Sequence, residues 1–329
     1  MKIGLPTSAF LSSSFEGDVS ARNICNDLGG TWRGSYGTAP CPVCQPERRR
    51  DQDALTLRDG TSRLVMNCKK GGCDFVDILA AAGLSARDYS PPSPEVIAQR
   101  AAAQEAEARK RAMQASTCWD ESLPAQDTPV ESYLRGRCIT ARLPAGIRYH
   151  PECWHGPSAR RQPAMVSAVN NEGGEAFGLP VSAVHRTFLE PDGYGGWRKA
   201  RVEQAKLMLG ATRGGYVELD SYSPCAPLVV CEGIETGLSL LSGLFEQPVS
   251  VWAALSTSGM KSLRLPAASG HLYLAPDADE AGMQAARVLG QTAVALGWKV
   301  GVVRSPADGG DWNDELKRRA LALATEGVA

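Results

Sequence analysis

Five acidic residues in the last third of the chain have types and positions suited to binding a metal ion. They are Glu232, Asp277, Asp279, Asp311 and Asp314. The first three lie in or close the apolar runs 227–233 and 271–279, and the other two follow the apolar run 299–304. An apolar run that closes with an acid is typical of a buried parallel strand, whose carboxyl end lies at the ligand-binding edge of the sheet. Three such strands would gather several carboxylates, which suit a hard divalent cation such as Mg²⁺ or Mn²⁺.

Helix capping is the alternative interpretation for some of these acids. Asp279 and Asp311 stand where helices are expected to begin, so each could cap a helix N-terminus. The four acids at strand ends, Glu232, Asp277, Asp279 and Asp311, together favour the metal interpretation. Asp314, one turn into the expected last helix, is the open case.

Four cysteines have the spacing of a metal site. Cys41-Pro-Val-Cys44 and Cys68-Lys-Lys-Gly-Gly-Cys73 are separated by 23 residues. Between them, segments 54–58 and 63–67 are predicted to form two strands around Asp59-Gly60, a favoured hairpin turn. Two cysteine knuckles that flank a hairpin predict a zinc ribbon with Cys41, Cys44, Cys68 and Cys73 as zinc ligands. Four unligated core thiols are the alternative.

The remaining cysteines show no ligand spacing, and we expect them to be small core residues. They are Cys25, Cys118, Cys138, Cys153, Cys225 and Cys231. Ten cysteines without a recognisable secretory signal indicate a reducing compartment, so we expect a cytoplasmic protein. No apolar stretch is long enough to span a membrane, so no membrane partner is expected.

Charge is distributed unevenly along a chain whose net charge is only −1. Residues 135–216 contain twelve Arg and Lys against six Asp and Glu, whereas residues from 226 onward contain eight against eleven. A basic middle beside an acidic end suits a protein that holds phosphates on one wall and metal ions on the other. Ordinary solvated charge is the alternative.

The basic middle offers several candidates for phosphate binding. We expect contacts to nucleotide or template from Arg186, Lys199, Arg201, Lys206 and Arg213. Arginine is suited to bidentate phosphate contacts. His185 is interpreted as a hydrogen-bonded structural residue, and Trp119, Trp154 and Trp197 are expected to pack in the core rather than stack on bases.

A basic surface is also expected around the zinc ribbon. Its members are Arg48, Arg49, Arg50, Arg58, Arg63, Lys69 and Lys70. A basic ribbon can contact a nucleic-acid backbone. Simple solvated charge is the alternative, since four aspartates dilute the patch.

Elements that must position these residues can be predicted from composition and periodicity. Residues 1–20 are expected to be loose, and a short helix is expected over 21–29. The segment 95–117 has a strong helix composition with few large apolar residues, which predicts a polar spacer helix. Short strands are expected at 164–170, 176–189 and 215–219. From 227 onward, apolar strands alternate with helices predicted at 235–245, 279–296 and 312–324, which indicates a parallel sheet with helices on both faces.

The order of the motifs is similar to that of a known family. Glu232-Gly233 after a strand, then Asp-Ala-Asp-Glu-Ala-Gly (277–282) and Asp-Trp-Asn-Asp (311–314), resembles the Toprim domain of bacterial and phage primases. Lys206-Leu-Met-Leu-Gly210 resembles the basic motif that precedes this domain in those primases. The four-cysteine ribbon followed by a linker is similar to the zinc-binding domain of phage replicative primases.

The resemblance implies an α/β fold in four parts. These are a zinc-ribbon DNA-binding domain over 20–90, a helical linker over 91–127, a basic α+β subdomain over 128–225 and a Toprim catalytic subdomain over 226–329. It also implies a DNA primase that joins ribonucleoside triphosphates on single-stranded DNA by two-metal nucleotidyl transfer. Asp277, Asp279 and Asp311 would hold Mg²⁺ or Mn²⁺, and Glu232 would hold metal or accept the hydroxyl proton.

Two other classes of function stay open at this stage. One is a non-catalytic DNA-binding protein of the recombination-mediator kind, and the other is a Toprim metal-dependent nuclease. The complete acidic set favours an enzyme. The chain contains no Gly-x-x-x-x-Gly-Lys-Ser/Thr phosphate loop, so a replicative helicase is expected to be a separate partner.

Overall fold

The computed structural model describes residues 20–49, 51–84, 93–171, 177–245, 247–304 and 311–326. The predicted loose segment before residue 20 and Arg50 lie outside these ranges. The chain divides into two compact units, one up to Glu105 and one from Ala106 onward.

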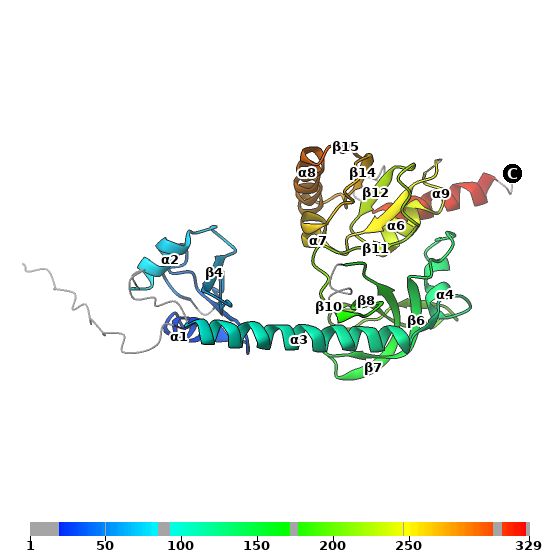
Figure 1. Ribbon diagram of the computed structural model, residues 1–329. Helices are drawn as coiled ribbons and strands as arrows, with labels where there is room; N and C mark the ends of the chain where they lie inside the picture. Colours follow the sequence, from blue (N-terminus) through cyan, green and yellow to red (C-terminus); the bar gives the residue numbers. More distant parts are fainter. Residues whose placement is uncertain are drawn as a thin grey trace, which may run out of the picture. The chain divides into compact units, whose positions relative to one another are not determined.

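The first unit is built on a small antiparallel sheet in the order β1-β2-β3-β4. Its elements, drawn in blue to cyan in Figure 1, are α1 (Ala21–Asp27), β1 (Thr31–Trp32), β2 (Gly37–Ala39), β3 (Leu55–Asp59), β4 (Leu64–Cys68) and α2 (Phe75–Ala81). The predicted hairpin is confirmed as β3 and β4. The Asp59-Gly60 pair does not form a two-residue turn, because Asp59 pairs with Leu64 and the connection runs over four residues. Gly60 N donates to Arg63 O inside this longer loop.

A long helix, α3 (Pro94–Asp120), begins in the first unit and ends in the second. It confirms and slightly extends the helix predicted at 95–117. Its side chains are exposed along most of its length, as its composition predicts, and only Ala112, Ala115 and Cys118 are buried.

The second unit contains two sheets. The first is antiparallel, in the order β10-β8-β7-β6-β5 with β9 paired to β8. Its elements are β5 (Leu123–Pro124), α4 (Pro129–Arg135), β6 (Ile147–His155), β7 (Arg160–Ala168), β8 (Ala183–Pro191), β9 (Trp197–Lys199) and β10 (Lys206–Gly210). One face of this sheet packs on α4 and on the second sheet's helices, through Ile147, Met165 and Leu189. The other face packs Val166, Val184 and Phe188 against the end of α3.

The second sheet is the predicted parallel one, in the order β11-β13-β12-β14-β15. Its elements are β11 (Val217–Glu218), β12 (Leu228–Cys231), α6 (Ile234–Leu240), β13 (Ser250–Ala253), α7 (Thr257–Ser262), β14 (His271–Ala275), α8 (Glu280–Ala295), β15 (Lys299–Val302) and α9 (Trp312–Glu326). Only β11 is antiparallel. The chain runs from β12 to β13 on one side of β12, and then crosses to β14 on the other side. Their carboxyl ends therefore frame a topological switch point, where open α/β sheets bind ligands.

Successive apolar side chains of the buried strands point to opposite faces of this sheet, which explains why helices cover both faces. Val229 and Cys231 of β12 face α6 and α9, whereas Leu228 and Val230 face α7 and α8. Figure 1 shows α8 on one side of the sheet and α6 and α9 on the other. The predicted α/β fold with two covered faces is confirmed. Helix α6 ends earlier than predicted, and the following turn contains Gly243 with φ +98°.

The prediction that the scattered cysteines lie in the core holds for four of the six. Cys25, Cys118, Cys153 and Cys231 are buried. Cys225 is exposed and Cys138 is half-buried. Cys225 precedes β12 in a surface turn, where no second layer covers it.

Within the residues described, no helix is both long enough and apolar enough to cross a bilayer.

Because α6 packs closely on the parallel sheet, one added methyl group at Gly237 is expected to lower the stability of the fold. A Cβ at Gly237 would overlap Leu219 and would lie 2.9 Å from Cys231 Sγ and 3.1 Å from Val251 Cγ1. We expect Gly237→Ala to lower the free energy of unfolding by about 1–3 kcal/mol, measured by urea denaturation.

Gly290→Ala on α8 is the matched control. There a Cβ would make ordinary contacts of 3.4 Å to Leu274 and 3.6 Å to Val300. Helix propensity should leave this variant unchanged or more stable by up to about 1 kcal/mol. Equal stability of the two variants would contradict the packing described for α6.

Candidate functional site

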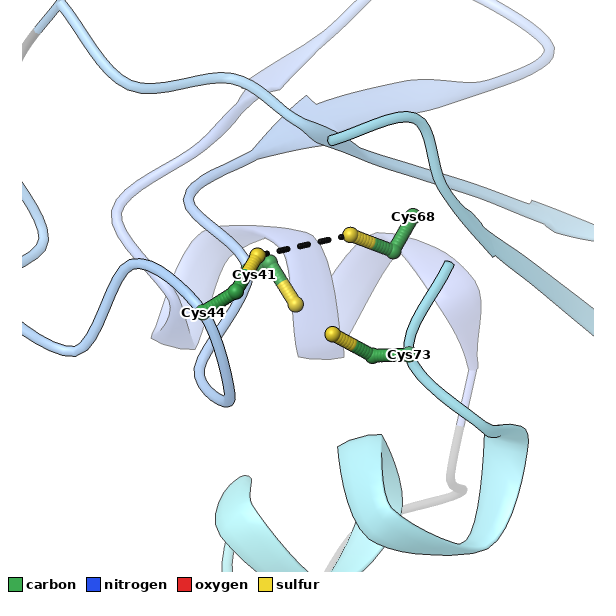
Figure 2. Close-up of side chains that lie close together, drawn as sticks. All are labelled: Cys41, Cys44, Cys68 and Cys73. Carbon is green, nitrogen blue, oxygen red and sulfur yellow. Dashed lines mark hydrogen bonds between the residues drawn. The ribbon is translucent and has the colours of Figure 1, made fainter. Parts of the chain in front are cut away.

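The four cysteines of the first unit converge as their spacing predicts. Their sulfur atoms all lie within 4.8 Å of one another, and Cys44 Sγ is 3.5 Å from Cys68 Sγ. Figure 2 shows the four side chains pointing toward a common centre from the two knuckles. Gln45 fixes the first knuckle, because its Oε1 accepts hydrogen bonds from Cys41 N and Ala54 N.

The second knuckle favours a thiolate at Cys68. Burial opposes ionisation, but the N–H groups of Gly71, Cys73 and Lys70 and the Cys44 thiol lower the pKa of Cys68 to about 6. Burial and hydrogen bonds to its neighbours raise the pKa of Cys73 to about 12. Four thiol groups held this close therefore resist ionising together, and a divalent cation relieves that conflict. A closed four-sulfur site is compatible with structural zinc.

Basic side chains of the first unit lie on its surface. Those expected around the zinc ribbon are all exposed where described: Arg48, Arg49, Arg58, Arg63, Lys69 and Lys70. Asp51, Asp53 and Asp74 are exposed among them.

In the second unit, two of the acids meet at the switch point of the parallel sheet. Glu232 directly follows β12 and is buried, and its Oε1 accepts a hydrogen bond of 3.2 Å from Asp277 N. Gly282, in the first turn of α8, makes this approach possible. A Cβ at Gly282 would collide with Glu232 Oε1 and lie 2.7 Å from Asp277 O.

The other aspartates cap helices, as the alternative interpretation expects. Asp279 Oδ1 accepts from Gly282 N at 2.7 Å and begins α8. Asp311 Oδ1 accepts from Asp314 N at 2.9 Å, and Asp314 Oδ2 accepts from Asp311 N at 3.4 Å, so the two begin α9 reciprocally. Asp314 also pairs with Lys317 at 3.6 Å. The cap engages Oδ1 of Asp279, and metal binding by the other oxygen of Asp279 is compatible with this cap.

The electrostatics of this edge favour a cation. Burial and then the nearby Asp277 and Asp279 carboxylates raise the pKa of Glu232. Burial and then the Asp311 and Asp279 carboxylates raise the pKa of Asp277. Asp277 Oδ1 is also buried without a hydrogen-bond partner. A buried orphan oxygen among mutually repelling carboxylates fits the donor set of Mg²⁺ or Mn²⁺.

Among the residues described, only the cysteines bring three or more candidate ligand atoms within 4.8 Å of one another. The acids are therefore spaced more widely than a closed metal cage. Such spacing agrees with the usual coordination of Mg²⁺, which keeps several water ligands and binds through one or two carboxylates.

Lys206 of β10 reaches this edge through an acid that the sequence analysis missed. Its Nζ is 2.9 Å from Glu235 Oε2, in the first turn of α6. Tyr133 OH donates to Glu235 Oε1 at 3.0 Å, so the carboxylate is held from both sides. Burial alone would raise the pKa of Glu235, but Lys206 lowers it to about 2. The sequence signal was a second acid, three residues after Glu232, which stands at the start of the following helix.

His185 lies beside this pair as a buried neutral ring. Burial lowers the pKa of His185 to about 4. Its Nδ1 is buried and has no hydrogen-bond partner. The hydrogen bond expected for His185 is therefore missing at this atom, where the ring is held by packing.

The remaining basic candidates are dispersed. Arg213 lines a cavity of about 530 Å³ with Lys261 and Ser256, beside the start of α7. Lys199 is exposed at the β8–β9 pairing, and Arg201 is exposed with its backbone near Glu190. Arg186 is buried on the face of β8 opposite to Lys206, because its strand partner is Leu207 and not Lys206.

The comparisons with known proteins agree with the architecture of the second unit. Residues 227–321 match the Toprim domain family model. Residues 109–219 match a domain of unknown function, DUF7146. No curated protein sequence matches the chain significantly.

Three solved structures with low similarity are DNA primases. The Aquifex aeolicus primase (zinc-binding and RNA polymerase domains) has 13% identity and a TM-score of 0.39, covering 94% of this chain and 82% of that one. A Pseudomonas aeruginosa DNA primase domain has 15% identity and a TM-score of 0.40, covering 65% and 77%. The primase fragment of the bacteriophage T7 primase-helicase has 15% identity and a TM-score of 0.37, covering 87% and 97%. The match of residues 227–321 to the Toprim domain and the geometry of the site are therefore the grounds on which a function can be proposed.

Zinc content tests the cysteine centre. We expect the purified protein to hold about one zinc ion per chain, and Cys68→Ser to lose most of it, measured by atomic absorption. Cys225→Ser, which removes an exposed thiol away from the cluster, should retain the metal. Unchanged zinc in the Cys68 variant would contradict the assignment.

The Lys206–Glu235 pair predicts a pH-dependent stability. In the wild type the lowered pKa of Glu235 contributes stability above its ordinary value of 4.5, which is lost as the pH falls toward 2. Lys206→Met leaves a buried carboxylate uncompensated, and we expect a loss of about 1–3 kcal/mol at pH 7 by urea denaturation.

The same variant should recover stability as the pH falls from 7 to 5. Burial without a counter-charge raises the pKa of Glu235 above its unfolded value, so protonation then favours the folded state. Lys206→Met with Glu235→Gln should regain stability at pH 7 and lose this pH dependence. A Lys206→Met penalty that is the same at both pH values would refute the pairing.

Proposed function

We propose that this protein is a DNA primase that joins ribonucleoside triphosphates on a single-stranded DNA template. The observation that carries the proposal is the acidic edge of the Toprim sheet meeting Lys206 of the basic sheet within one compact unit. Nucleotidyl transfer needs both: carboxylates to hold divalent cations and a fixed positive charge for phosphates.

The acids divide into those that would hold metal and one that could also move a proton. Asp277, Asp279 and Asp311 would hold Mg²⁺ or Mn²⁺, with Glu232 as a further ligand. A bound divalent cation would neutralise charge on the α-phosphate and the pyrophosphate leaving group. The raised pKa of Glu232 makes it a stronger base than an ordinary carboxylate, so Glu232 is suited to accept the proton of the attacking 3′-hydroxyl. Asp314 is the weakest candidate, since it already pairs with Lys317.

Lys206 is the residue best placed to position incoming phosphates. Glu235 holds its ammonium group at 2.9 Å, and its side chain is still 41% exposed, so it remains accessible to a substrate. Its charge also reaches Asp277, where it opposes the rise in that residue's pKa. Arg213, beside a cavity near the start of α7, would hold a further phosphate. Lys199 and Arg201, exposed farther along the sheet, would follow the template backbone.

The unit that contains the cysteine centre would bind the DNA template. A zinc-stabilised ribbon carrying exposed Arg and Lys side chains provides sequence-tolerant contact with a DNA backbone. It would form the DNA-binding domain predicted over residues 20–90, and α3 would belong to the linker predicted over residues 91–127. A replicative helicase would act as a separate partner.

Primer synthesis is the direct test of this function. With single-stranded DNA, Mg²⁺ and labelled ribonucleoside triphosphates, the wild type should produce short RNA. Asp277→Asn with Asp279→Asn should lower the rate by at least about 100-fold, because the transition-state charge loses its cation ligands. Asp120→Asn, an exposed acid at the end of α3, should retain wild-type rate.

The products distinguish the remaining classes of function. RNA synthesis that persists in the Asp277→Asn, Asp279→Asn variant would contradict the assignment of these acids as metal ligands. Shortened template without RNA would indicate a Toprim nuclease, and DNA binding with neither product would indicate a recombination-mediator-like module.

A further inference from the structure

A cavity on the far side of the antiparallel sheet is separate from the acidic edge. It has a volume of about 750 Å³, within the range of small-molecule sites, and it lies between the end of α3 and strands β6, β7, β8 and β10. Its basic lining residues are Arg109 and Lys110 of α3, Arg161 of β7 and Arg186 of β8, and its acid is Glu121.

Strand geometry places this cavity on the face opposite the proposed catalytic centre. Successive side chains on a strand point to opposite faces. His185 interacts with Glu235 and Lys206 on one face, so Arg186 must project from the other. The register agrees, because Arg186 pairs with Leu207, a second lining residue, and Thr187 pairs with Lys206.

Arg186 is the feature that points to a ligand. The residue is 9% exposed, and its Nε is buried without a hydrogen-bond partner. Its Nη1 donates to Trp154 O at 3.0 Å, and Arg161 Nη1 donates to Glu152 O at 3.1 Å. Both acceptors are backbone carbonyls without net charge. Arg186 also contacts the Cys153 thiol, whose pKa is lowered by a hydrogen bond with Cys118 and by the charges of Arg186 and Arg161. Glu121, the one lining acid, is 3.2 Å from His150.

Large apolar side chains line the same cavity and remain exposed. Trp154, expected in the core from sequence, is 51% exposed, and Met113 is 56% exposed. Trp154 and Arg186 line one cavity, and an indole and a guanidinium suit a ligand with a flat ring and an anionic group. A nucleotide unit combines these two features.

We propose that this cavity is a second nucleotide-binding site, with the phosphate held by Arg186 and Arg161 and the base stacked on Trp154. The nucleotide unit could belong to a single DNA strand that continues beyond the catalytic face, or to a free nucleotide that regulates the enzyme. The proposal does not depend on the primase assignment, because none of the acidic-edge residues takes part.

Equilibrium binding tests the proposal in a background that lacks two of the proposed metal ligands of the other face. The full-length Asp277→Asn, Asp279→Asn protein would be titrated with ATP and with fluorescein-labelled dT12, without added divalent cations. Binding of dT12 would be followed by fluorescein anisotropy and binding of ATP by isothermal titration calorimetry, and we expect at least one of the two probes to bind. Arg161→Ala and Trp154→Ala, both at exposed or half-exposed positions, should each weaken that binding by about tenfold. Arg186→Lys should weaken it as well, with thermal denaturation reporting its folding.

Arg287→Ala on α8 removes an equal charge from an exposed position and serves as the matched control. It should change affinity less than about twofold. Loss confined to dT12 identifies a DNA strand as the occupant, and loss of ATP binding identifies a free nucleotide. If Arg161→Ala and Trp154→Ala bind both probes as the control does, the proposal is overturned.

Discussion

Repulsion between carboxylates at the switch point of the parallel sheet is the constraint on which the second unit depends. Asp277 carries a buried oxygen without a partner, and burial and then the neighbouring Asp311 and Asp279 carboxylates raise its pKa. A fold does not keep such a group for stability, since an unpaired buried polar atom costs free energy. The arrangement is understandable if a divalent cation occupies this edge during function, because the cation converts repulsion into coordination.

The rest of the unit holds this edge against the basic sheet. Lys206 and Tyr133 come from the antiparallel part and both bind Glu235 of α6. Asn313 of α9 adds a second tie, since its Nδ2 donates to Arg137 O at 2.8 Å and to Ser239 Oγ at 3.0 Å. Glu235 therefore fixes the position of the proposed phosphate-binding lysine. In the proposed function Glu235 would be a positioning residue, and the acids at the strand ends would supply the chemistry.

Local sequence patterns predicted the elements well and the side-chain directions less well. Apolar runs that end in acids identified β12 and β14, and cysteine spacing identified the ribbon, because both signals depend on neighbours in the chain. The face of Arg186 depends on the register of β8 with β10, which no local pattern reveals. The burial of Glu235 and the exposure of Trp154 depend on which layer covers them, and that is settled only in the tertiary fold. The predicted domain boundaries at 90, 127 and 225 stay predictions.

The location of divalent cations tests the central claim most directly. Crystals of the full-length protein grown with Mn²⁺ would be measured for anomalous scattering. We predict an anomalous peak at the carboxyl ends of β12 and β14, with oxygen ligands from Asp277 and at least one of Glu232, Asp279 and Asp311. A fully occupied Mn²⁺ bound elsewhere, with these four carboxylates free of metal, would contradict the account.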